Sequence, residues 1–480
     1  MFYVMRDAHC AMLSSARPWA AATRLVCENP FSPFAYLPQS RAVAATCEMF
    51  ERVTRTYSKP AFSLGVAERV LWERPFCRLI AFGEPSAKPK LLIVAPMSGH
   101  YATLLRGTVA AFLDTHQVFI TDWADAKQVP LSAGTFDLHD YVDYCHAMFA
   151  VLGPDLHVMA VCQPSVPVLA AIALMEAEDH PLVPRSATLI GGPIDTRRSP
   201  TAVNRLPQER GLAWFERHCI HTVPWSYPGS GRPVYPGFLQ LAGFMGMNLD
   251  RHVSAHWSMF DHLVRGDGDS AARHREFYDE YLAVMDLTAE FFLQTVRTVF
   301  VEHALPRGEM RHRGRLVDLS AIRRCALMAV EGEQDDISGV GQTRAALDLS
   351  TNLPEDRKAY HLQIGAGHYG VFNGSRFRAE IVPKITAFMA QNARKAPQGH
   401  VTDRTNATAI DPALLRAHRG QVVEGRDEPS APAEPAASQA RRRSLEQLLG
   451  RGSNVVRLAA SGKYLRRPGR RLTVRGRLPF

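Results

Sequence analysis

Short apolar runs alternate with helical stretches along two parts of this 480-residue chain. The runs are rich in β-branched residues and are closed by proline, glycine or polar turns. This alternation is typical of a mostly parallel sheet with helices on both faces, because each strand is then buried on both sides. The sequence therefore predicts an α/β fold. The predicted strands are 89–96, 116–123, 156–162, 186–193, 325–336 and 358–368, and the predicted helices are 101–114, 139–152, 164–177 and 340–349.

The alternation stops between residues 197 and 318, where a segment rich in proline, glycine and aromatics runs into long helical stretches. A helical block between two strands of such a sheet predicts a cap over the carboxyl edge, and a separate helical domain is the alternative. The polar end of the chain, rich in proline and alanine, predicts disorder. We expect five parts: an N-terminal helical region (1–78), the first part of the sheet domain (79–196), a helical cap (197–318), the second part of the sheet domain (319–394) and a disordered basic tail (395–480).

Positive charge is concentrated at the C-terminal end. Residues 441–480 hold twelve Lys and Arg and one acidic residue, Glu446, so their net charge is +11. The whole chain has a net charge of +9, so the other 440 residues sum to −2. A near-neutral body argues against nucleic-acid binding there. The tail is a candidate for contact with an anionic surface, and a solvated, unstructured tail is the alternative.

The sequence shows neither a targeting segment nor a metal-binding pattern. Its start is not basic and is broken by Arg6, Asp7 and His9, which favours an amphipathic helix over a signal peptide, and no apolar run is long enough to span a bilayer. The eight cysteines form no CxxC pair and no cluster with zinc spacing. We expect a cytoplasmic protein that uses no metal and no cofactor.

Cys162 stands where a predicted strand turns into a predicted helix. In an open α/β sheet, reactive residues lie at the carboxyl ends of strands, and a sharp turn there pushes a nucleophile out of the sheet. The usual pattern is G-x-S-x-G, and here Ala160 and Pro164 replace the glycines while Cys162 replaces the serine. Proline is tolerated in the first turn of a helix, whose N-terminus favours a thiolate. Ser165, three residues later, is expected inside the helix rather than as the nucleophile.

Two further polar side chains follow later strands in the order nucleophile, acid, histidine. Asp335 and Asp336 follow the next-to-last predicted strand, and His368 follows the last one on a glycine-rich loop. A histidine can take the thiol proton, and an acid can hold its ring in the right tautomer. We favour Asp335 over Asp336 as the acid. Asp195, close to Arg197 and Arg198, is expected to form a structural ion pair.

Acyl transfer also needs backbone N–H donors for the developing oxyanion. Gln163, directly after the nucleophile, is the first candidate, and Met97 or Ser98 in the loop after the first core strand supplies the second. His100 in the same loop is a candidate contact for substrate, with a solvated side chain as the alternative. Trp123 ends another strand and is a candidate pocket residue, with a buried packing role as the alternative.

Several unusual strings resemble the intracellular polyhydroxyalkanoate (poly-3-hydroxybutyrate) depolymerases over roughly residues 1–392. The resemblance implies an α/β-hydrolase fold with a cap, a cysteine nucleophile, and hydrolysis of the ester bonds of stored polymer at cytoplasmic granules. The family's Cys, Asp and His fall on Cys162, Asp335 and His368. The strings are "RVTRTYSKPAF" (52–62), "VCQPSVP", "YPGFLQLAGFMGMNLDRH" (235–252), "FYDEYLAVMDLTAEFFLQT" (277–295), "VEGEQDDISGVGQT" and "GAGHYGVFNGSRF".

Other functions compatible with these residues are polyhydroxyalkanoate synthesis, coenzyme A-dependent thiolysis of the polymer, and hydrolysis of small esters or thioesters. Synthases of this fold normally keep glycine on both sides of the nucleophile, and this chain keeps neither. A non-catalytic granule protein is the alternative from another class, and it would not need Cys162, Asp335 and His368 together.

Overall fold

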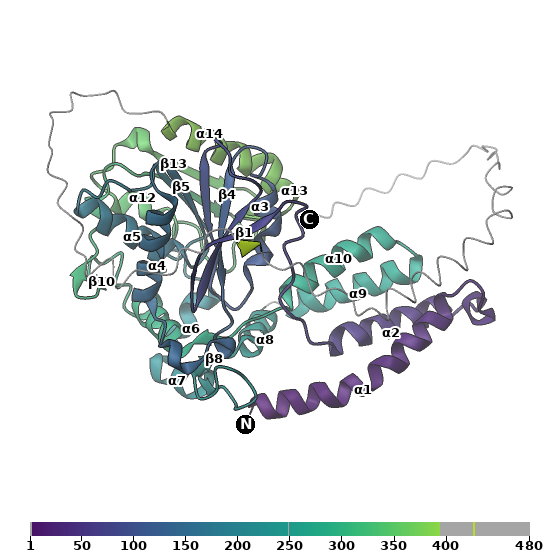
Figure 1. The fold of residues 1–480 in the computed structure, drawn as a ribbon. Helices are drawn as coiled ribbons and strands as arrows, with labels where there is room; N and C mark the ends of the chain where they lie inside the picture. The colour runs from purple at the N-terminus through teal and green to yellow at the C-terminus, as the bar shows by residue number, and fades with distance from the viewer. Residues whose placement is uncertain (1, 248, 394–425, 428–480) are drawn as a thin grey trace, which may run out of the picture. The chain divides into compact units, whose positions relative to one another are not determined.

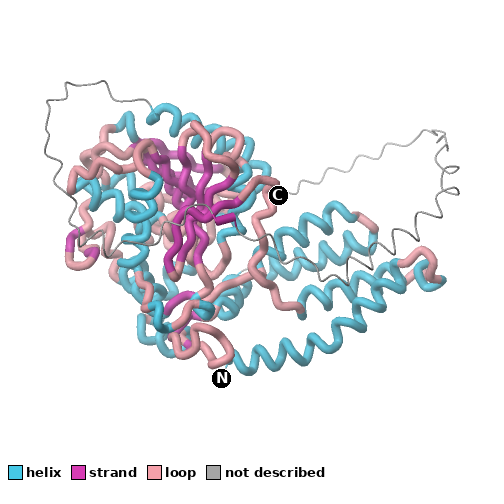
Figure 2. Tube along the Cα trace, viewed as in Figure 1, coloured by secondary structure: helices cyan, strands magenta, loops and turns pink. Residues whose placement is uncertain are grey.

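A nine-stranded sheet forms the centre of the molecule (Figures 1 and 2). The computed structural model describes residues 2–247, 249–393 and 426–427. The strand order is β13-β12-β6-β5-β3-β4-β2-β1-β14. The strands are β1 (Glu68–Arg74), β2 (Cys77–Phe82), β3 (Lys90–Val94), β4 (Gln117–Trp123), β5 (Leu156–Val161), β6 (Ser186–Ile190), β12 (Ala326–Gly332), β13 (Lys358–Gln363) and β14 (Arg426–Asp427).

The sheet is mostly parallel. Strands β3, β4, β5, β6, β12 and β13 run in one direction, whereas β2 is antiparallel to both of its neighbours. Strands β4, β5, β6 and β12 are buried along their whole length, as strands covered on both faces must be. The predicted fold class, an α/β-hydrolase, is confirmed, and all six predicted strands are present.

Helices cover both faces of the sheet (Figure 2). Helix α5 (Ser165–Ala177) is buried from Ser165 to Glu176, which explains its almost uniformly apolar sequence. Helix α4 (Leu138–Leu152) buries one face and begins at a capping box formed by Asp137 and Asp140. The predicted helices near 101–114 and 340–349 are shorter than expected, namely α3 (Arg106–Ala110) after a 3₁₀ turn at Ala102–Leu105, and α12 (Ala345–Leu349).

The N-terminal region differs from the prediction in its last part. Residues 68–74 form β1 and pair with β2, although 1–78 was predicted to be helical. Alternate residues of β1, Val70 and Trp72, are buried while Glu73 is exposed, so the period is that of a strand. The cross-strand contacts of a short hairpin at the sheet's antiparallel side decide this conformation.

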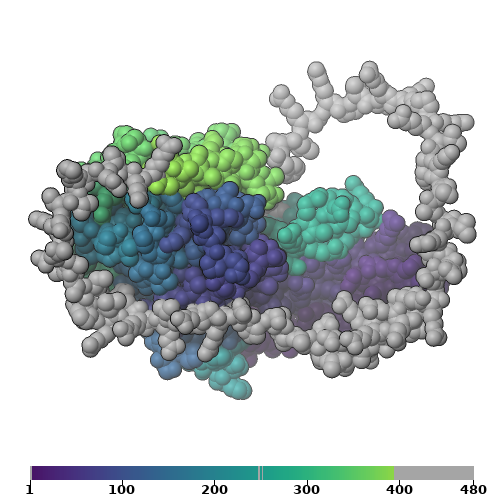
Figure 3. All heavy atoms as spheres, turned by 45° about the horizontal axis from the view of Figure 1, so that its top comes forward, coloured from purple at the N-terminus to yellow at the C-terminus, as the bar shows by residue number. Residues whose placement is uncertain are grey.

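Four helices pack side by side next to the sheet domain (Figures 1 and 3). They are α1 (Phe2–Glu28), α2 (Ser40–Thr54), α9 (Leu249–Arg265) and α10 (Gly268–Tyr281). Arg275 forms an ion pair with the buried Glu48 at 2.5 Å, and Arg52 pairs with Asp279 at 2.7 Å. These pairs join α2 to α10, which lies far away in the sequence.

Helices α6 to α11 lie between β6 and β12, where a cap was predicted. The part nearest the sheet contains α6 (Ala202–Arg210), α7 (Leu212–Cys219), α8 (Gly237–Met247), α11 (Ala289–Thr295), a π-helical turn at Val296–Val301, and a small sheet of β7 (His221–Thr222), β8 (Pro233–Tyr235) and β9 (Leu287–Thr288). Arg232 is buried and donates to the carbonyl oxygens of Val129, Pro130 and Gly134, which ties this region to the sheet domain. A two-stranded ribbon, β10 (Arg311–His312) and β11 (Arg315–Leu316), precedes β12.

The tail predicted over 395–480, with its basic segment 441–480, lies outside the described residues except for β14. No helix in the described ranges is long and apolar enough to cross a bilayer.

We predict that Glu176 is essential for the stability of the sheet domain. Its buried carboxylate accepts hydrogen bonds from the backbone N–H groups of Arg324 and Cys325, both at 2.8 Å, and from the Arg324 guanidinium at 2.9 Å. Glu176→Ala leaves two buried donors unpaired and should lower the free energy of unfolding by about 3–5 kcal/mol, measured by urea denaturation.

Glu178→Ala is the matched control, because Glu178 lies two residues away and forms an exposed ion pair with Arg315. It should cost at most about 1 kcal/mol. Equal losses in the two variants would show that the buried bonds of Glu176 do not stabilise the fold.

Candidate active site

Cys162 lies on a strained turn between β5 and α5. It has φ of +68°, in the left-handed region that residues with a side chain rarely adopt. Its N–H donates to the Ile190 carbonyl at 2.7 Å, so the ladder to β6 continues into the turn. Pro164 is the N-cap of α5, and the helix begins at Ser165. Ser165 is fully buried within the helix as expected, and only the Cys162 side chain of the two lines a cavity.

Asp335 and His368 are brought together from the ends of two strands. Asp335 follows β12, and His368 begins a short 3₁₀ turn (His368–Val371) after β13. The His368 Nδ1 atom lies 2.8 Å from Asp335 Oδ2. Asp335 Oδ1 accepts hydrogen bonds from the backbone N–H groups of Ile337 and Ser338 at 2.9 and 2.8 Å. The carboxylate is therefore fixed by three donors and orients the ring.

The surroundings of His368 determine its charge. Its burial alone would lower the pKa, but the negative charge of Asp335, the charge of Cys162 and hydrogen bonds to both raise the pKa of His368 well above its usual value. The bond to Asp335 uses Nδ1, so Nε2 is the ring nitrogen left to face the sulfur. A histidine made more basic in this way, beside a cysteine, is suited to take the thiol proton.

The other carboxylates considered from the sequence lie elsewhere. Asp336 is exposed, whereas Asp335 is buried and lies 2.8 Å from the His368 ring. Asp195 forms a two-point ion pair with Arg197, at 2.7 and 3.0 Å, and a longer one with Arg198 at 3.4 Å. The geometry thus favours Asp335 as the partner of the histidine and gives Asp195 the structural role that was expected.

Two glycines at the end of β6 make room for this arrangement, and sequence reasoning gave them no role. A Cβ atom on Gly191 would lie 3.1 Å from His368 Cε1 and 3.4 Å from Asp335 Oδ2, and Gly191 also has φ of +57°. A Cβ atom on Gly192 would collide with the Ser165 side chain. The pair Gly-Gly near the end of the predicted strand 186–193 was the available signal, because only glycine permits such close approach.

A buried glutamate supports the loop that carries Asp335. The Glu331 carboxylate accepts hydrogen bonds from the backbone N–H groups of Gly341, Thr343 and Arg344 at 2.8, 2.7 and 3.0 Å and from the Tyr360 hydroxyl at 2.8 Å. The Thr343 hydroxyl in turn accepts from the Gly192 N–H at 2.8 Å. Glu331 was not identified from the sequence, because its neighbours in the strand gave no sign of its partners.

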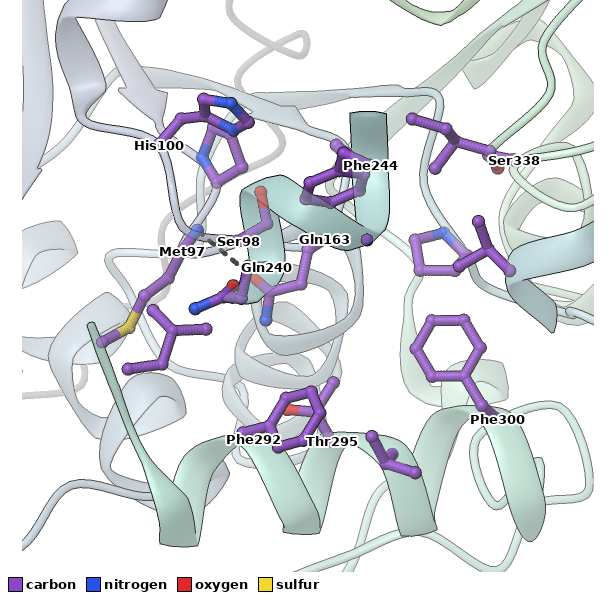
Figure 4. A pocket seen from close by; sticks show the side chains of 18 of the residues that line it. Met97, Ser98, His100, Gln163, Gln240, Phe244, Phe292, Thr295, Phe300 and Ser338 are labelled. Carbon is purple, nitrogen blue, oxygen red and sulfur yellow. Dashed lines mark hydrogen bonds between the residues drawn. The ribbon is translucent and has the colours of Figure 1, made fainter. Parts of the chain in front are cut away.

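These groups open into an apolar cavity of about 450 Å³ between the carboxyl edge of the sheet and the cap (Figure 4). Cys162 and His368 line it together with Met97, Ser98, His100 and Gln163. The cap contributes mainly aromatic and aliphatic side chains, including Tyr235, Phe244, Phe291, Phe292 and Phe300. No group of three or more His, Cys, Asp or Glu side chains suited to a metal ion occurs within the described ranges.

The backbone N–H groups that are candidate oxyanion donors differ in whether they already have a hydrogen-bond acceptor. The backbone N–H groups of Gln163 and Ser98 donate to no other described residue. The Met97 N–H instead donates to the side-chain oxygen of Gln163 at 3.3 Å (Figure 4). The Met97 N–H is thus occupied by a carboxamide oxygen, and it becomes free for another acceptor only when the Gln163 side chain turns away.

Of the two residues that the sequence offered as candidate contacts for substrate, His100 lines the cavity and Trp123 does not. Trp123 is buried in the core and does not line the cavity, because its indole N–H donates to the Ala95 carbonyl at 2.9 Å and its ring packs on Tyr141 at 4.4 Å. The expectation that it lines the pocket is wrong, and its packing role holds. His100 is buried and lines the cavity, so the solvated alternative for this residue is wrong.

We predict that Gly191→Ala displaces the His368 ring. The added methyl group would press on Cε1 of the ring, lengthen its bond to Asp335 and lower the pKa of His368, which NMR of the Cε1 proton would measure. Gly65→Ala is the control, because Gly65 has φ of +71° but nothing within 4 Å of the added methyl. Both variants should lose about 1–2 kcal/mol of stability from backbone strain. An unchanged His368 titration in Gly191→Ala would contradict the role of the glycine.

Residues 191–393 match the family model described as "PHB de-polymerase C-terminus". No curated protein matches the chain. One similar solved structure is the complex of DcsB with its substrate analogue, with 11% sequence identity, coverage of 68% of this chain and 98% of that chain, and a TM-score of 0.41. A second is the esterase RhEst1 from Rhodococcus sp. ECU1013, with 12% identity, coverage of 68% of this chain and 98% of that chain, and a TM-score of 0.39. A third is the monoacylglycerol lipase of Paleococcus ferrophilus, with 10% identity, coverage of 66% of this chain and 99% of that chain, and a TM-score of 0.39. Residues 191–393 are therefore similar to the C-terminal part of the poly-3-hydroxybutyrate depolymerase family, the family that the motifs resemble.

Proposed function

We propose that this protein hydrolyses the ester bonds of stored poly-3-hydroxybutyrate, with Cys162 as nucleophile, His368 as general base and acid, and Asp335 as the group that orients His368. The observation that carries the proposal is the buried Asp335–His368 pair, 2.8 Å apart, beside a cysteine on a strained strand-to-helix turn. The family match over residues 191–393 supports the polymer as substrate.

Acylation begins at the sulfur. His368 Nε2 takes the thiol proton, and Sγ attacks the ester carbonyl carbon. The carbonyl oxygen becomes an oxyanion that the N–H groups of Gln163 and of Ser98 or Met97 stabilise, Met97 after the Gln163 side chain has turned away. The carbon–oxygen bond then breaks, the leaving alkoxide takes the proton from His368, and a 3-hydroxyacyl thioester remains on Cys162.

Deacylation returns the enzyme to its starting state. His368 takes a proton from water, whose oxygen attacks the thioester carbonyl. The carbon–sulfur bond breaks, and the thiolate or its conjugate acid is restored as the 3-hydroxy acid leaves. Throughout both steps Asp335 keeps Nδ1 protonated, so that only Nε2 exchanges protons with substrate.

The cavity suits a short-chain polyester. A polyester segment is apolar except for its ester oxygens, and the cavity is lined mostly by carbon, with few polar atoms. The proposal places the enzyme at polymer granules in the cytoplasm, where its substrate is an insoluble surface rather than a dissolved ester.

We predict that Cys162→Ala abolishes the release of 3-hydroxybutyrate from amorphous granules, with at least an about 10³-fold lower rate, because no acyl-enzyme can form. Cys162→Ser should retain a small activity. Cys47→Ala is the control, since Cys47 is also half-buried but lies on α2. Full release by folded Cys162→Ala would disprove the mechanism. Release that requires added coenzyme A would indicate thiolysis instead.

We predict that Asp335→Asn lowers kcat by about 10³- to 10⁴-fold, because an amide neither fixes the tautomer nor stabilises the imidazolium. The same substitution lowers the pKa of His368, which loses its anionic partner. Asp336→Asn, at the exposed neighbouring position, should change kcat less than about twofold. The opposite order of effects would make Asp336 the catalytic acid.

A further inference from the structure

Helix α1 turns its apolar side to solvent. It packs on α2 at the edge of the four-helix layer (Figure 1), and among residues 3–28 only Tyr3 is buried. Over residues 4–26 no exposed position holds Lys, Arg, Asp or Glu, and Met12 and Trp19 are 65% and 78% exposed. We call this side the outer face of α1. Its large apolar side chains are Val4, Met5, Met12, Trp19, Leu25 and Val26.

The charged residues of α1 lie on the opposite side. The four charged residues within 4–26 are Arg6, Asp7, Arg17 and Arg24, and all are partly buried. Arg24 forms an ion pair with Glu51 of α2 at 3.1 Å, and Arg17 lines a polar cavity between α1 and α2. A helix on the surface of a soluble protein normally buries its apolar stripe and exposes its charges. In α1 this arrangement is reversed, so covering the outer face with an apolar partner is favourable.

The outer face is wider than one partner helix covers. At 3.6 residues per turn, the exposed positions within 4–26 span about 200° of the helix circumference. The stripe by which a helix packs on its neighbours is about 100° wide. Exposed apolar side chains also follow the helix, at Phe31, Phe34, Tyr36 and Leu37. An extended surface therefore fits this region better than the same helix of a second copy.

The absence of charge on the outer face indicates that the surface it meets is uncharged. Helices that bind anionic lipid carry Lys and Arg beside their apolar face. In α1 the guanidinium groups of Arg17 and Arg24 lie toward α2 instead, and no acidic side chain on the outer face attracts the basic segment 441–480. A polyester surface has no ionic group and offers alkyl groups and ester carbonyl oxygens, to which the exposed indole N–H of Trp19 can donate.

The beginning of α1 is attached to the cap that lines the active-site cavity. The Tyr3 hydroxyl donates to Asp286 Oδ2 at 2.5 Å, and the Tyr3 ring packs on Phe238 of α8 with 5.4 Å between the ring centroids. Helix α8 also contributes Gln240 and Phe244 to the lining of the cavity. A polymer held on the outer face of α1 is thus held by a helix that contacts the wall of the active site.

We propose that the outer face of α1, together with the apolar turn at 31–37, is the surface by which this protein docks on amorphous polyester. The inference rests on the proposed function, which supplies the polymer, and it adds the segment that holds the enzyme there. Docking is separable from catalysis, because no described residue of α1 lines the active-site cavity.

The test uses an insoluble and a soluble substrate, namely amorphous poly-3-hydroxybutyrate granules and the linear trimer of 3-hydroxybutyrate. Met12→Asp and Trp19→Asp place a charge on the outer face. Each should raise the amount of granules needed for half-maximal rate by at least about 10-fold, because a large apolar side chain then no longer leaves water on docking. Both variants should keep kcat/KM on the trimer within about twofold of the wild type, which also shows that they are folded.

Leu316→Asp is the matched control, because Leu316 is also an exposed apolar residue but lies on β11. It should behave like the wild type on both substrates. Unchanged granule kinetics in both α1 variants would overturn the inference and leave the proposed function intact. Failure of the wild type to release product from granules and from the trimer would overturn the proposed function and this inference with it.

Two measurements examine the other possible occupants of the outer face. Light scattering that shows a dimeric wild type and monomeric Met12→Asp and Trp19→Asp variants would assign the face to a second copy and overturn the inference. Vesicles of phosphatidylglycerol and a film of amorphous poly-3-hydroxybutyrate distinguish a lipid surface from the polymer. The wild type should bind the film at least about 10-fold more tightly, and equal binding to both, lost in the two variants, would assign the face to a membrane instead.

Discussion

The hydrogen bond between Asp335 and His368 is the interaction on which the site depends. The strand order places His368 far from Cys162, so the loop that carries His368 must cross two strands to bring the ring into the site. Cys162 follows β5, whereas His368 follows β13, and β6 and β12 lie between them. Neighbouring strands are about 4.8 Å apart, so the histidine loop must reach back about 14 Å over the end of β6. Gly191 stands at that end, and its missing Cβ leaves room for the ring beside Asp335. The position of one glycine thus decides whether three distant strands can form one site.

The support beneath this pair is also electrostatic. Burying the Glu331 carboxylate is costly, and the cost is offset by three backbone N–H donors and the Tyr360 hydroxyl, which together close the loop after Asp335. Thr343, in the same loop, bonds to Gly192 at the end of β6. The acid loop and the glycine turn are therefore held to each other, so that a change in one alters the distance between Asp335 and the histidine.

Much of this could be predicted from the sequence, for reasons that are local. A buried strand, a turn and an apolar helix are readable at β5 and α5, and the chain order of Cys162, Asp335 and His368 follows from counting strands. What could not be predicted depends on contacts between distant segments. Trp123 ends a strand like a pocket residue, but its side chain packs on α4. The conformation of β1 depends on its pairing with β2.

The two histidines of the cavity show how one environment produces two chemistries. Both are buried, and burial disfavours the charged ring in each case. Only His368 has a carboxylate and a sulfur as partners, so its pKa rises, whereas His100 has none and its pKa falls to about 4. In a low-dielectric site the Asp335 charge acts strongly because little water screens it. A basic ring and a weakly basic ring therefore line the same cavity, and the charged partners of His368, which His100 lacks, make the difference between them.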